Sequence, residues 1–218
     1  MVVKAPTRGG EVGLIIDDAI VHPDTTITQG RINSLYNANI LEIIDQSISR
    51  YGKCRILEVG AGYGAFATAL HSLYPGRLEY IIVELPNILW NAVCYLGAVG
   101  NPCLVGPNQK FPETFETALV ANYLVGEYRG DMGPVDLAIN TMSFIEMSET
   151  QVCYYRDLMS DLLRSDGRCF IEGTPTKPHH VNCDLVFSET MLNRIDVPQM
   201  PAYCGGVHST IWEKNKLV

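Results

Sequence analysis

The residues whose types and spacing could bind a cofactor lie between Ile56 and Gly64, in the segment Ile-Leu-Glu-Val-Gly-Ala-Gly-Tyr-Gly. An apolar run that ends in an acid and three alternating glycines is typical of a buried strand leading into a tight turn. Glycine has no Cβ atom, so the backbone of such a turn can approach a ligand closely. A helix is expected from about Ala65, with Phe66 and Leu70 on one face. The segment therefore predicts a loop that binds a nucleotide-like cofactor.

A second acid narrows the choice of cofactor. Glu84 ends the apolar stretch 79–84, about 20 residues after the glycines, where a carboxylate can accept hydrogen bonds from ribose hydroxyls. This pattern suits both NAD and S-adenosylmethionine, and the glycine spacing also satisfies the dinucleotide fingerprint. Glu58 separates the two cofactors, because a carboxylate beside the turn would repel a pyrophosphate but favour the ammonium of a methionyl group. We therefore expect S-adenosylmethionine rather than NAD.

The elements that must position these residues alternate along the chain between strand-like and helix-like stretches. The expected strands are residues 56–59, 79–84, 102–106, 135–140, 168–173 and 208–212. The expected helices begin at about Ala65, Pro86, Ser148 and Asp184, and the residues before Tyr51 form a helical prelude. This order predicts an α/β fold with a mostly parallel, doubly wound sheet and helices on both of its faces.

Some boundaries are better defined than others. The helix after Ser148 has the clearest start, because Ser148 and Gln151 form a capping-box pattern. Its apolar face is expected to continue toward a stop at Gly167. Residues 184–195 are expected to form one further helix. The stretch Ala118–Ala121 fits either an extra strand or the start of a helix, and both interpretations stay open.

Length and composition limit the classes of protein that fit. The 218 residues, 47% of them hydrophobic, suffice for one α/β domain with a sizeable core. The net charge of -8 and a pI near 5.1 disfavour nucleic acid and anionic membranes as partners. No apolar run approaches the ~18 residues of a membrane span, and the first residues lack a signal peptide's hydrophobic stretch, so a cytoplasmic location is expected. The seven cysteines are odd in number and far apart, which indicates reduced thiols.

With these motifs in place, the chain resembles the class I S-adenosylmethionine-dependent methyltransferases, through the E-x-G-x-G-x-G loop and the strand-end acid Glu84. Over most of residues 20–172 it is also similar to bacterial proteins described as sugar O-methyltransferases. The motifs that carry this second resemblance are His22-Pro23-Asp24-Thr25, Gln29-x-Arg31-x-Asn33-x-Leu35-Tyr36, Val83-Glu84-Leu85-Pro86 and Ile139-Asn140-Thr141-x-Ser143-Phe144-x-Glu146-Met147. That family more often has Asp at the position of Glu84, and many of its members extend further at the N-terminus. The resemblance implies a Rossmann-like class I methyltransferase fold with an N-terminal helical prelude.

The resemblance also implies a role for each matching residue. The residues expected to line the methionyl side of the cofactor are Glu58, Gly60, Ala61, Gly62 and Tyr63. Glu84 would hold the ribose diol, and Leu85 would pack on the adenine. Asn108 could reach the adenine edge after strand 102–106, although a simple turn role beside Pro107 is the stronger expectation.

Methyl transfer to oxygen is an in-line displacement at a sulfonium carbon, and it needs a base that takes up the hydroxyl proton. Glu146 is one candidate, since it lies close in sequence to the strand end at Asn140, although it could equally accept backbone hydrogen bonds at the next helix start. His179 and His180 follow the fifth expected strand, where adjacent loop histidines are more often only solvated. Asn140 ends the fourth expected strand, where α/β sheets place their ligands, so a role near the transferred methyl is expected. His208 is more readily a structural histidine than a base.

Four further residues could bind the acceptor. Thr141 and Ser143 could orient its hydroxyl, although short hydroxyl side chains after a strand often only cap backbone groups. Gln29 and Arg31 could contact a polar acceptor from the N-terminal helix or could form a solvated helix face. No metal is expected, because the strand-end acids are better used on the cofactor.

The sequence thus predicts an S-adenosylmethionine-dependent methyltransferase for a small-molecule acceptor, with a hydroxyl of a sugar or glycosylated metabolite expected. Residues 1–50 should form a helical segment packed on a methyltransferase domain at 51–218. Neither nucleic acid nor membrane is an expected partner, and a homo-oligomer stays open. Two alternatives also stay open: N- or C-methylation of another small metabolite, and a non-catalytic partner subunit that binds the cofactor.

Overall fold

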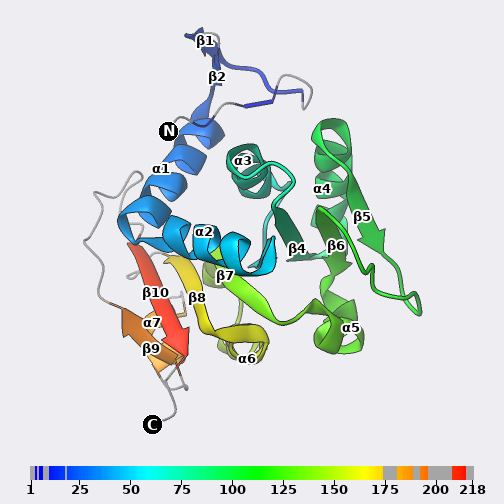
Figure 1. The fold of residues 1–218 in the computed structure, drawn as a ribbon, viewed down its shortest axis with the longest axis vertical. Coiled ribbons are helices and arrows are strands. Elements are labelled where there is room, and N and C mark those ends of the chain that lie inside the picture. The colour runs from blue at the N-terminus through cyan, green and yellow to red at the C-terminus, as the bar shows by residue number, and fades with distance from the viewer. Residues whose placement is uncertain are drawn as a thin grey trace.

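The computed structural model describes residues 3, 5–6, 10–17, 19–173, 181–188, 192–195 and 208–214. Within these residues an eight-stranded sheet forms the centre, with the strand order β5-β6-β4-β3-β7-β8-β10-β9 (Figure 1). Its strands are β3 (Cys54–Val59), β4 (Leu78–Glu84), β5 (Pro102–Val105), β6 (Thr117–Ala121), β7 (Val135–Thr141), β8 (Leu163–Gly173), β9 (Leu192–Ile195) and β10 (His208–Lys214). The six strands from β5 to β8 are parallel to their neighbours, whereas β10 is antiparallel to both β8 and β9. The predicted mostly parallel sheet is therefore confirmed.

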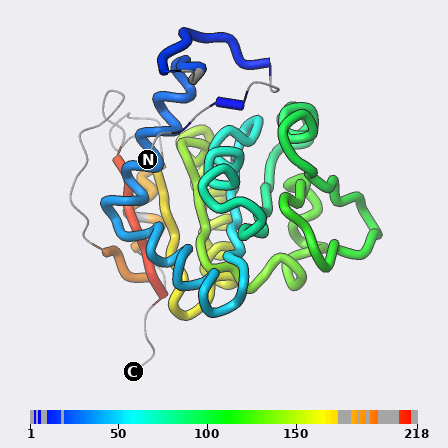
Figure 2. The backbone as a smooth tube through the Cα atoms, turned by 45° about the horizontal axis from the view of Figure 1, so that its top comes forward, coloured from blue at the N-terminus to red at the C-terminus, as the bar shows by residue number. Residues whose placement is uncertain are grey.

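Helices cover both faces of the sheet, as Figures 1 and 2 show. The helices are α1 (Pro23–Asn37), α2 (Ile40–Tyr51), α3 (Ala65–Leu73), α4 (Pro86–Val99), α5 (Val125–Met132), α6 (Glu149–Leu162) and α7 (Cys183–Ser188). On one face α2 packs on β3 and β7, while α3 packs beside Tyr80 of β4. On the other face α5, α6 and α7 pack in succession, and Phe187 of α7 contacts Trp212 of β10. The doubly wound arrangement follows from this covering of both faces.

The central strands are buried along almost their whole length because both of their faces are covered. In β7 every residue is buried, and in β3 only Arg55 is partly exposed. Such strands read as continuous apolar runs rather than as alternating ones, which is why the segments 56–59, 79–84 and 135–140 were recognisable in the sequence. The same burial means that a polar side chain at a strand end is held by specific partners.

Two stretches that the sequence described poorly are strands. Ala118–Ala121, which fitted a strand or a helix, belongs to β6 and inserts between β4 and the edge strand β5. The helix expected over 184–195 was wrong in its second half, because α7 ends at Ser188 and Leu192–Ile195 pairs with β10. Pairing with a neighbouring strand outweighs a local helical pattern in such short segments.

Two further boundaries differ from expectation. Helix α6 begins with the predicted capping box of Ser148 and Gln151, but it ends at Leu162 rather than near Gly167. Leu163 is buried and starts β8 by pairing with Val135, so the chain is already extended at Gly167. Before the helical prelude, β1 (Leu14–Ile16) and β2 (Ala19–Val21) form a hairpin that projects beyond the end of α1 (Figure 1).

Candidate functional site

The carboxyl ends of β3, β4, β6 and β7 meet at one edge of the sheet and border a cavity of about 390 Å³. This volume lies in the range of cavities that bind small molecules and cofactors. Its lining residues are Val59, Gly60, Gly62, Val83, Glu84, Leu85, Ile88, Asn122, Thr141, Met142, Ser143, Glu146, Met147, Gln151 and Tyr155. Open α/β sheets bind their ligands at this edge, so we take this cavity as the candidate cofactor site.

The turn after β3 is held together by Asn140 at the end of β7. The Asn140 amide donates to the Val59 carbonyl at 2.8 Å and to the Ser143 hydroxyl at 2.5 Å, and its carbonyl accepts from the Phe144 N–H at 3.3 Å. Asn140 is fully buried and does not line the cavity. The structure therefore places it as a clamp between two strand ends, while Ser143 lines the cavity.

Gly60 must be glycine for two reasons. Its φ of +75° is in the left-handed region, and a Cβ atom there would lie 2.0 Å from the Ser143 hydroxyl and 2.3 Å from the Ser143 Cβ. Gly62 also has a positive φ, of +59°, but nothing lies within 4 Å of the position of its missing Cβ. The first glycine thus makes room for the protein's own turn, whereas the second leaves open space on a residue that lines the cavity.

Glu84 is the best-positioned charged side chain at the cavity. Its two carboxylate oxygens accept hydrogen bonds from backbone N–H groups, one from Gly62 at 2.9 Å and the other from Leu85 at 2.7 Å. Burial raises the pKa of this carboxyl, the two backbone hydrogen bonds oppose that shift, and the nearby charge of Glu146 adds to it. Each oxygen keeps a second lone pair for a ligand donor. The carboxylate is therefore oriented in advance to accept a pair of hydroxyl groups.

Glu58 lies beneath the turn and does not line the cavity. Its side chain has no exposed surface, and it accepts hydrogen bonds from the Tyr80 hydroxyl at 2.7 Å and the Thr141 hydroxyl at 3.4 Å. Burial raises the pKa of Glu58 to about 7, although the Tyr80 hydrogen bond and the charge of Arg31 act in the opposite direction. Thr141 lines the cavity, so it links the buried Glu58 to the cavity wall.

Arg31 faces the interior of the protein rather than forming a solvated helix face. Its guanidinium donates to the Glu172 carboxylate at 2.7 Å, and the Glu172 side chain is almost fully buried at the end of β8. Gln29, two residues earlier on α1, instead accepts a hydrogen bond from the Val3 N–H and donates to Asn33. Neither Arg31 nor Gln29 lines the cavity. Their expected contact with an acceptor stays a prediction.

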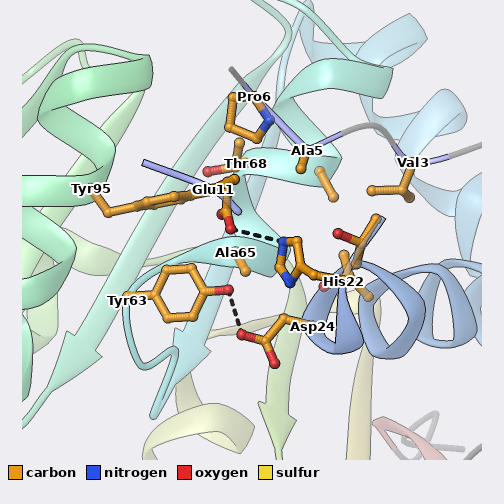
Figure 3. Close-up of a pocket in the computed structure, with 13 residues that line it drawn as sticks. Val3, Ala5, Pro6, Glu11, His22, Asp24, Tyr63, Ala65, Thr68 and Tyr95 are labelled. Carbon is orange, nitrogen blue, oxygen red and sulfur yellow. Dashed lines mark hydrogen bonds and ion pairs between the residues drawn. The ribbon is translucent and has the colours of Figure 1, made fainter. Parts of the chain in front are cut away.

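The Tyr63 side chain points toward Asp24, as Figure 3 shows. Its hydroxyl donates to Asp24 at the start of α1, and its ring packs edge-on against Tyr95 of α4. These residues border a second, small cavity of about 20 Å³, beside the ion pair of Glu11 and His22 at 2.8 Å. Tyr63 therefore ties the N-terminal segment to the glycine turn, and it does not line the larger cavity.

Several residues at the cavity could not be assigned from the sequence. Asn122 follows β6 directly and forms a hydrogen bond with Tyr155. Burial raises the pKa of Tyr155, and the hydrogen bond from Asn122 acts in the opposite direction. Asn122 was missed because residues 118–121 were not recognised as the strand beside β4. Met142 lines the cavity with a left-handed φ of +71°, which is unusual for a residue other than glycine. No signal in the sequence indicated that conformation.

Asn108 does not line this cavity. Asn108 lies on an exposed turn after the edge strand β5, where its φ is +57° and its N–H donates to Glu127 at 2.6 Å. It therefore has the turn role that was the stronger expectation. His179 and His180 lie outside the described residues. His208 is exposed at the start of β10, opposite Gly173.

The described residues show neither a metal-binding cluster nor a membrane-spanning helix. Among the described parts of the chain, no three His, Cys, Asp or Glu side chains converge in a way that could hold a metal ion. Within the same residues, no helix combines the length and the apolar character that crossing a membrane requires.

Replacing Gly60 by Ala should lower the free energy of unfolding by about 1 to 3 kcal/mol more than replacing Gly62 by Ala, as measured by urea denaturation. Both substitutions force a side chain into a left-handed backbone, which costs roughly 1 to 2 kcal/mol at either position. Only Gly60→Ala also meets Ser143. Equal losses for the two variants would contradict the packing of Ser143 on the turn.

The pKa of Glu58 makes stability depend on pH. Its folded pKa of about 7 lies above the ordinary value of 4.5, so the stability that its proton provides is complete below about pH 4.5 and is lost as pH rises through 7. Relative to the wild type, Glu58→Gln should therefore gain roughly 2 to 3 kcal/mol of unfolding free energy between pH 5 and pH 8. Denaturation of both proteins at each pH tests this, with the exposed Glu113→Gln as the control. A difference that does not change with pH would contradict the buried, proton-binding state.

No protein-family model matches the sequence, and no relative among curated proteins was found. Solved structures do match the fold. The chain superimposes on mitomycin 7-O-methyltransferase with a TM-score of 0.53 and 13% identity, covering 88% of this chain and 60% of that one. Fibrillarin from Aeropyrum pernix matches with a TM-score of 0.52 and 14% identity, covering 73% and 65%. Human N-acetylserotonin methyltransferase matches with a TM-score of 0.50 and 13% identity, covering 88% and 56%.

The chain spans less than two thirds of the length of each of these three proteins. At such low identity the likeness concerns the fold. The strand order, the covered parallel sheet and these neighbours agree with the prediction from the sequence. The chain therefore has the Rossmann-like fold of class I S-adenosylmethionine-dependent methyltransferases.

Proposed function

We propose that the protein is an S-adenosylmethionine-dependent methyltransferase that acts on a small-molecule acceptor. The observation that carries this proposal is the Glu84 carboxylate, held by two backbone N–H groups at the wall of a cavity of about 390 Å³. A carboxylate in that position suits the two hydroxyl groups of a ribose. Next to it, the open face of Gly62 lets a ligand approach the backbone closely.

The remaining lining residues fit the rest of the cofactor. Leu85 and Ile88 offer an apolar surface for the adenine, and Asn122 offers an amide that can pair with its polar edge. We assign this edge to Asn122 in place of Asn108, because only Asn122 lines the cavity. The methionyl end would lie toward Gly60 and Thr141, above the buried carboxyl of Glu58. Support for the cofactor also comes from the neighbouring fibrillarin structure, which is described as containing natively bound S-adenosyl-L-methionine.

The bound cofactor would supply an activated methyl group, and the protein must align the acceptor and remove its proton. Of the two carboxyl side chains that line the cavity, Glu146 would be left for the second task, because Glu84 would bind the ribose. It lies in the short 3-10 helix Ser143–Glu146, which follows the end of β7. Thr141 and Ser143 precede it at the cavity wall and could orient an acceptor hydroxyl. His179 and His180 remain further candidates for the base from the sequence.

We propose a sugar or a glycosylated metabolite as the acceptor, with oxygen as the methylated atom. The proposal of a sugar rests on the sequence motifs shared with proteins described as sugar O-methyltransferases. Among the structural neighbours, the names of mitomycin 7-O-methyltransferase and an O-methyltransferase family 2 protein in complex with apigenin support oxygen as the acceptor atom. A neighbour described as a pericyclic reaction enzyme shares the fold with a TM-score of 0.51, so turnover must be measured.

Replacing Glu84 by Ala should weaken S-adenosylhomocysteine binding by about 1.5 to 3 kcal/mol, roughly 10- to 150-fold, because charge-assisted hydrogen bonds to the ribose are lost. Isothermal calorimetry of the wild type and the variant measures this difference. Glu113→Ala is the matched control, since Glu113 is exposed on the loop between β5 and β6. Unchanged affinity in the Glu84 variant would overturn the ribose assignment.

Replacing Asn122 by Ala should weaken adenosine binding by about 0.5 to 1.5 kcal/mol, the usual contribution of one hydrogen bond. Replacing Asn108 by Ala should leave adenosine affinity unchanged, because Asn108 lies on an exposed turn outside the cavity. The two variants therefore distinguish the two candidate adenine contacts. The opposite ranking would restore Asn108 to the site.

The test of catalysis is formation of S-adenosylhomocysteine from S-adenosylmethionine in the presence of pooled sugars and glycosylated metabolites. With an acceptor in hand, Glu146→Gln should lower turnover at least tenfold while leaving S-adenosylhomocysteine affinity within about twofold, as expected for loss of a general base. Normal turnover in this variant would exclude Glu146 as the base. Cofactor binding without turnover on any acceptor would instead favour the non-catalytic partner subunit.

A further inference from the structure

A buried cluster of charged and polar groups lies under the glycine turn, on the side of the sheet covered by α1 and α3. It contains two carboxyl groups, Glu58 and Glu172, and one guanidinium, that of Arg31. Arg31 donates a hydrogen bond to Glu172, and the ionised form of Glu58 is favoured by the Tyr80 hydrogen bond, then by the charge of Arg31 and then by the Thr141 hydroxyl. When the neighbouring positive charge also forms an ion pair with another carboxylate, its attraction offsets only part of the free-energy cost of burying a charged carboxylate.

The surroundings of Glu58 explain why it holds a proton near neutral pH. From α1 it faces the charge of Arg31, which favours ionisation, and from β4 it faces Glu84, which opposes it. From β7 it meets the uncharged Thr141. From α3 the nearest titratable group is His71, which packs on Tyr80 and whose pKa is lowered by burial. Desolvation outweighs these contributions and raises the pKa of Glu58 to about 7.

We propose that Glu58 gives up a proton to solvent when the methionyl ammonium of the cofactor binds above Thr141. This inference rests on the proposed function, because it needs a ligand with a positive charge at the methionyl end of the cavity. An added positive charge near a carboxyl favours its ionised form. Binding of the ammonium and ionisation of Glu58 are then two parts of one equilibrium.

The hydroxyl of Thr141 can serve both states of Glu58. The Thr141 hydroxyl lies 3.4 Å from one carboxyl oxygen of Glu58, to which it can donate. When that carboxyl oxygen carries a proton, the Thr141 oxygen can accept its hydrogen bond instead. After the proton has passed to the buffer, the hydroxyl of Thr141 turns and donates to the carboxylate instead. Tyr80 donates to the second carboxyl oxygen at 2.7 Å in either state. No other bond changes, and the released proton balances the charge that the ligand brings.

Calorimetric titration with S-adenosylhomocysteine in buffers of different ionisation enthalpy measures the protons released on binding. If ligand binding lowers the pKa of Glu58 by about two units, each binding event should release about 0.8 proton at pH 6, about 0.5 proton at pH 7 and under about 0.1 proton at pH 8.5. The affinity should accordingly rise as pH increases from 6 to 8. Adenosine has the ribose but no ammonium, so it should bind without this proton release. Any protons that Glu84 releases or takes up on binding the ribose are measured with adenosine and subtracted from the count for S-adenosylhomocysteine.

Two variants assign the proton to Glu58. Glu58→Gln should bind S-adenosylhomocysteine with the same proton count as adenosine at every pH. Tyr80→Phe removes a hydrogen bond that lowers the pKa of Glu58. Proton release on binding of S-adenosylhomocysteine to this variant should therefore occur at higher pH than in the wild type. Proton release that survives in Glu58→Gln, or equal release for the two ligands in the wild type, would overturn the inference. Absence of S-adenosylhomocysteine binding to the wild type would instead overturn the proposed function.

Discussion

The hydrogen bonds that Gly62 and Leu85 donate to Glu84 are the interaction on which the rest of the site depends. They join the glycine turn after β3 to the end of β4, and they fix both oxygens of one carboxylate at the cavity wall. The arrangement requires neighbouring parallel strands that end at the same level. It also requires a backbone that turns sharply after β3, because only then does the Gly62 N–H face the next strand. Fold and site are therefore two consequences of one arrangement of backbone groups.

The hydrogen bonds of Asn140 hold the glycine turn from the side of β7, opposite the hydrogen bonds of Glu84 on the side of β4. The Asn140 amide binds the Val59 carbonyl and the Ser143 hydroxyl, so the ends of β3 and β7 are held together without using a group that lines the cavity. Gly60 has no side chain where Ser143 packs. The side chains at the cavity are thus backed by buried hydrogen bonds, which is how a protein keeps a ligand site in one geometry before the ligand arrives.

The central strands and most of the residues at their ends could be predicted from the sequence, because burial leaves a clear pattern in it. Buried parallel strands read as mainly apolar runs, so β3, β4 and β7 were identified directly, together with Glu58, Glu84 and Asn140 at or near their ends. The strands β6 and β9 were harder to predict. Ala118–Ala121 is too short to show a hydrophobic period, and Leu192–Ile195 is a strand only through its pairing with β10. Because the sequence left Ala118–Ala121 open between a strand and a helix, the place of Asn122 at a strand end was not predicted. The direction of a side chain was also hidden, since Tyr63 and Asn140 carry the right motif yet face Asp24 and Val59.

The most direct test of this account is calorimetric titration of the purified protein with S-adenosylhomocysteine and, separately, with NAD. A carboxylate at Glu84 and a buried carboxyl at Glu58 predict saturable binding of S-adenosylhomocysteine with one site per chain and no binding of NAD. Binding of NAD alone would contradict the account and would reassign the glycine turn to a dinucleotide. Binding of neither ligand would show that this cavity alone is not a cofactor site.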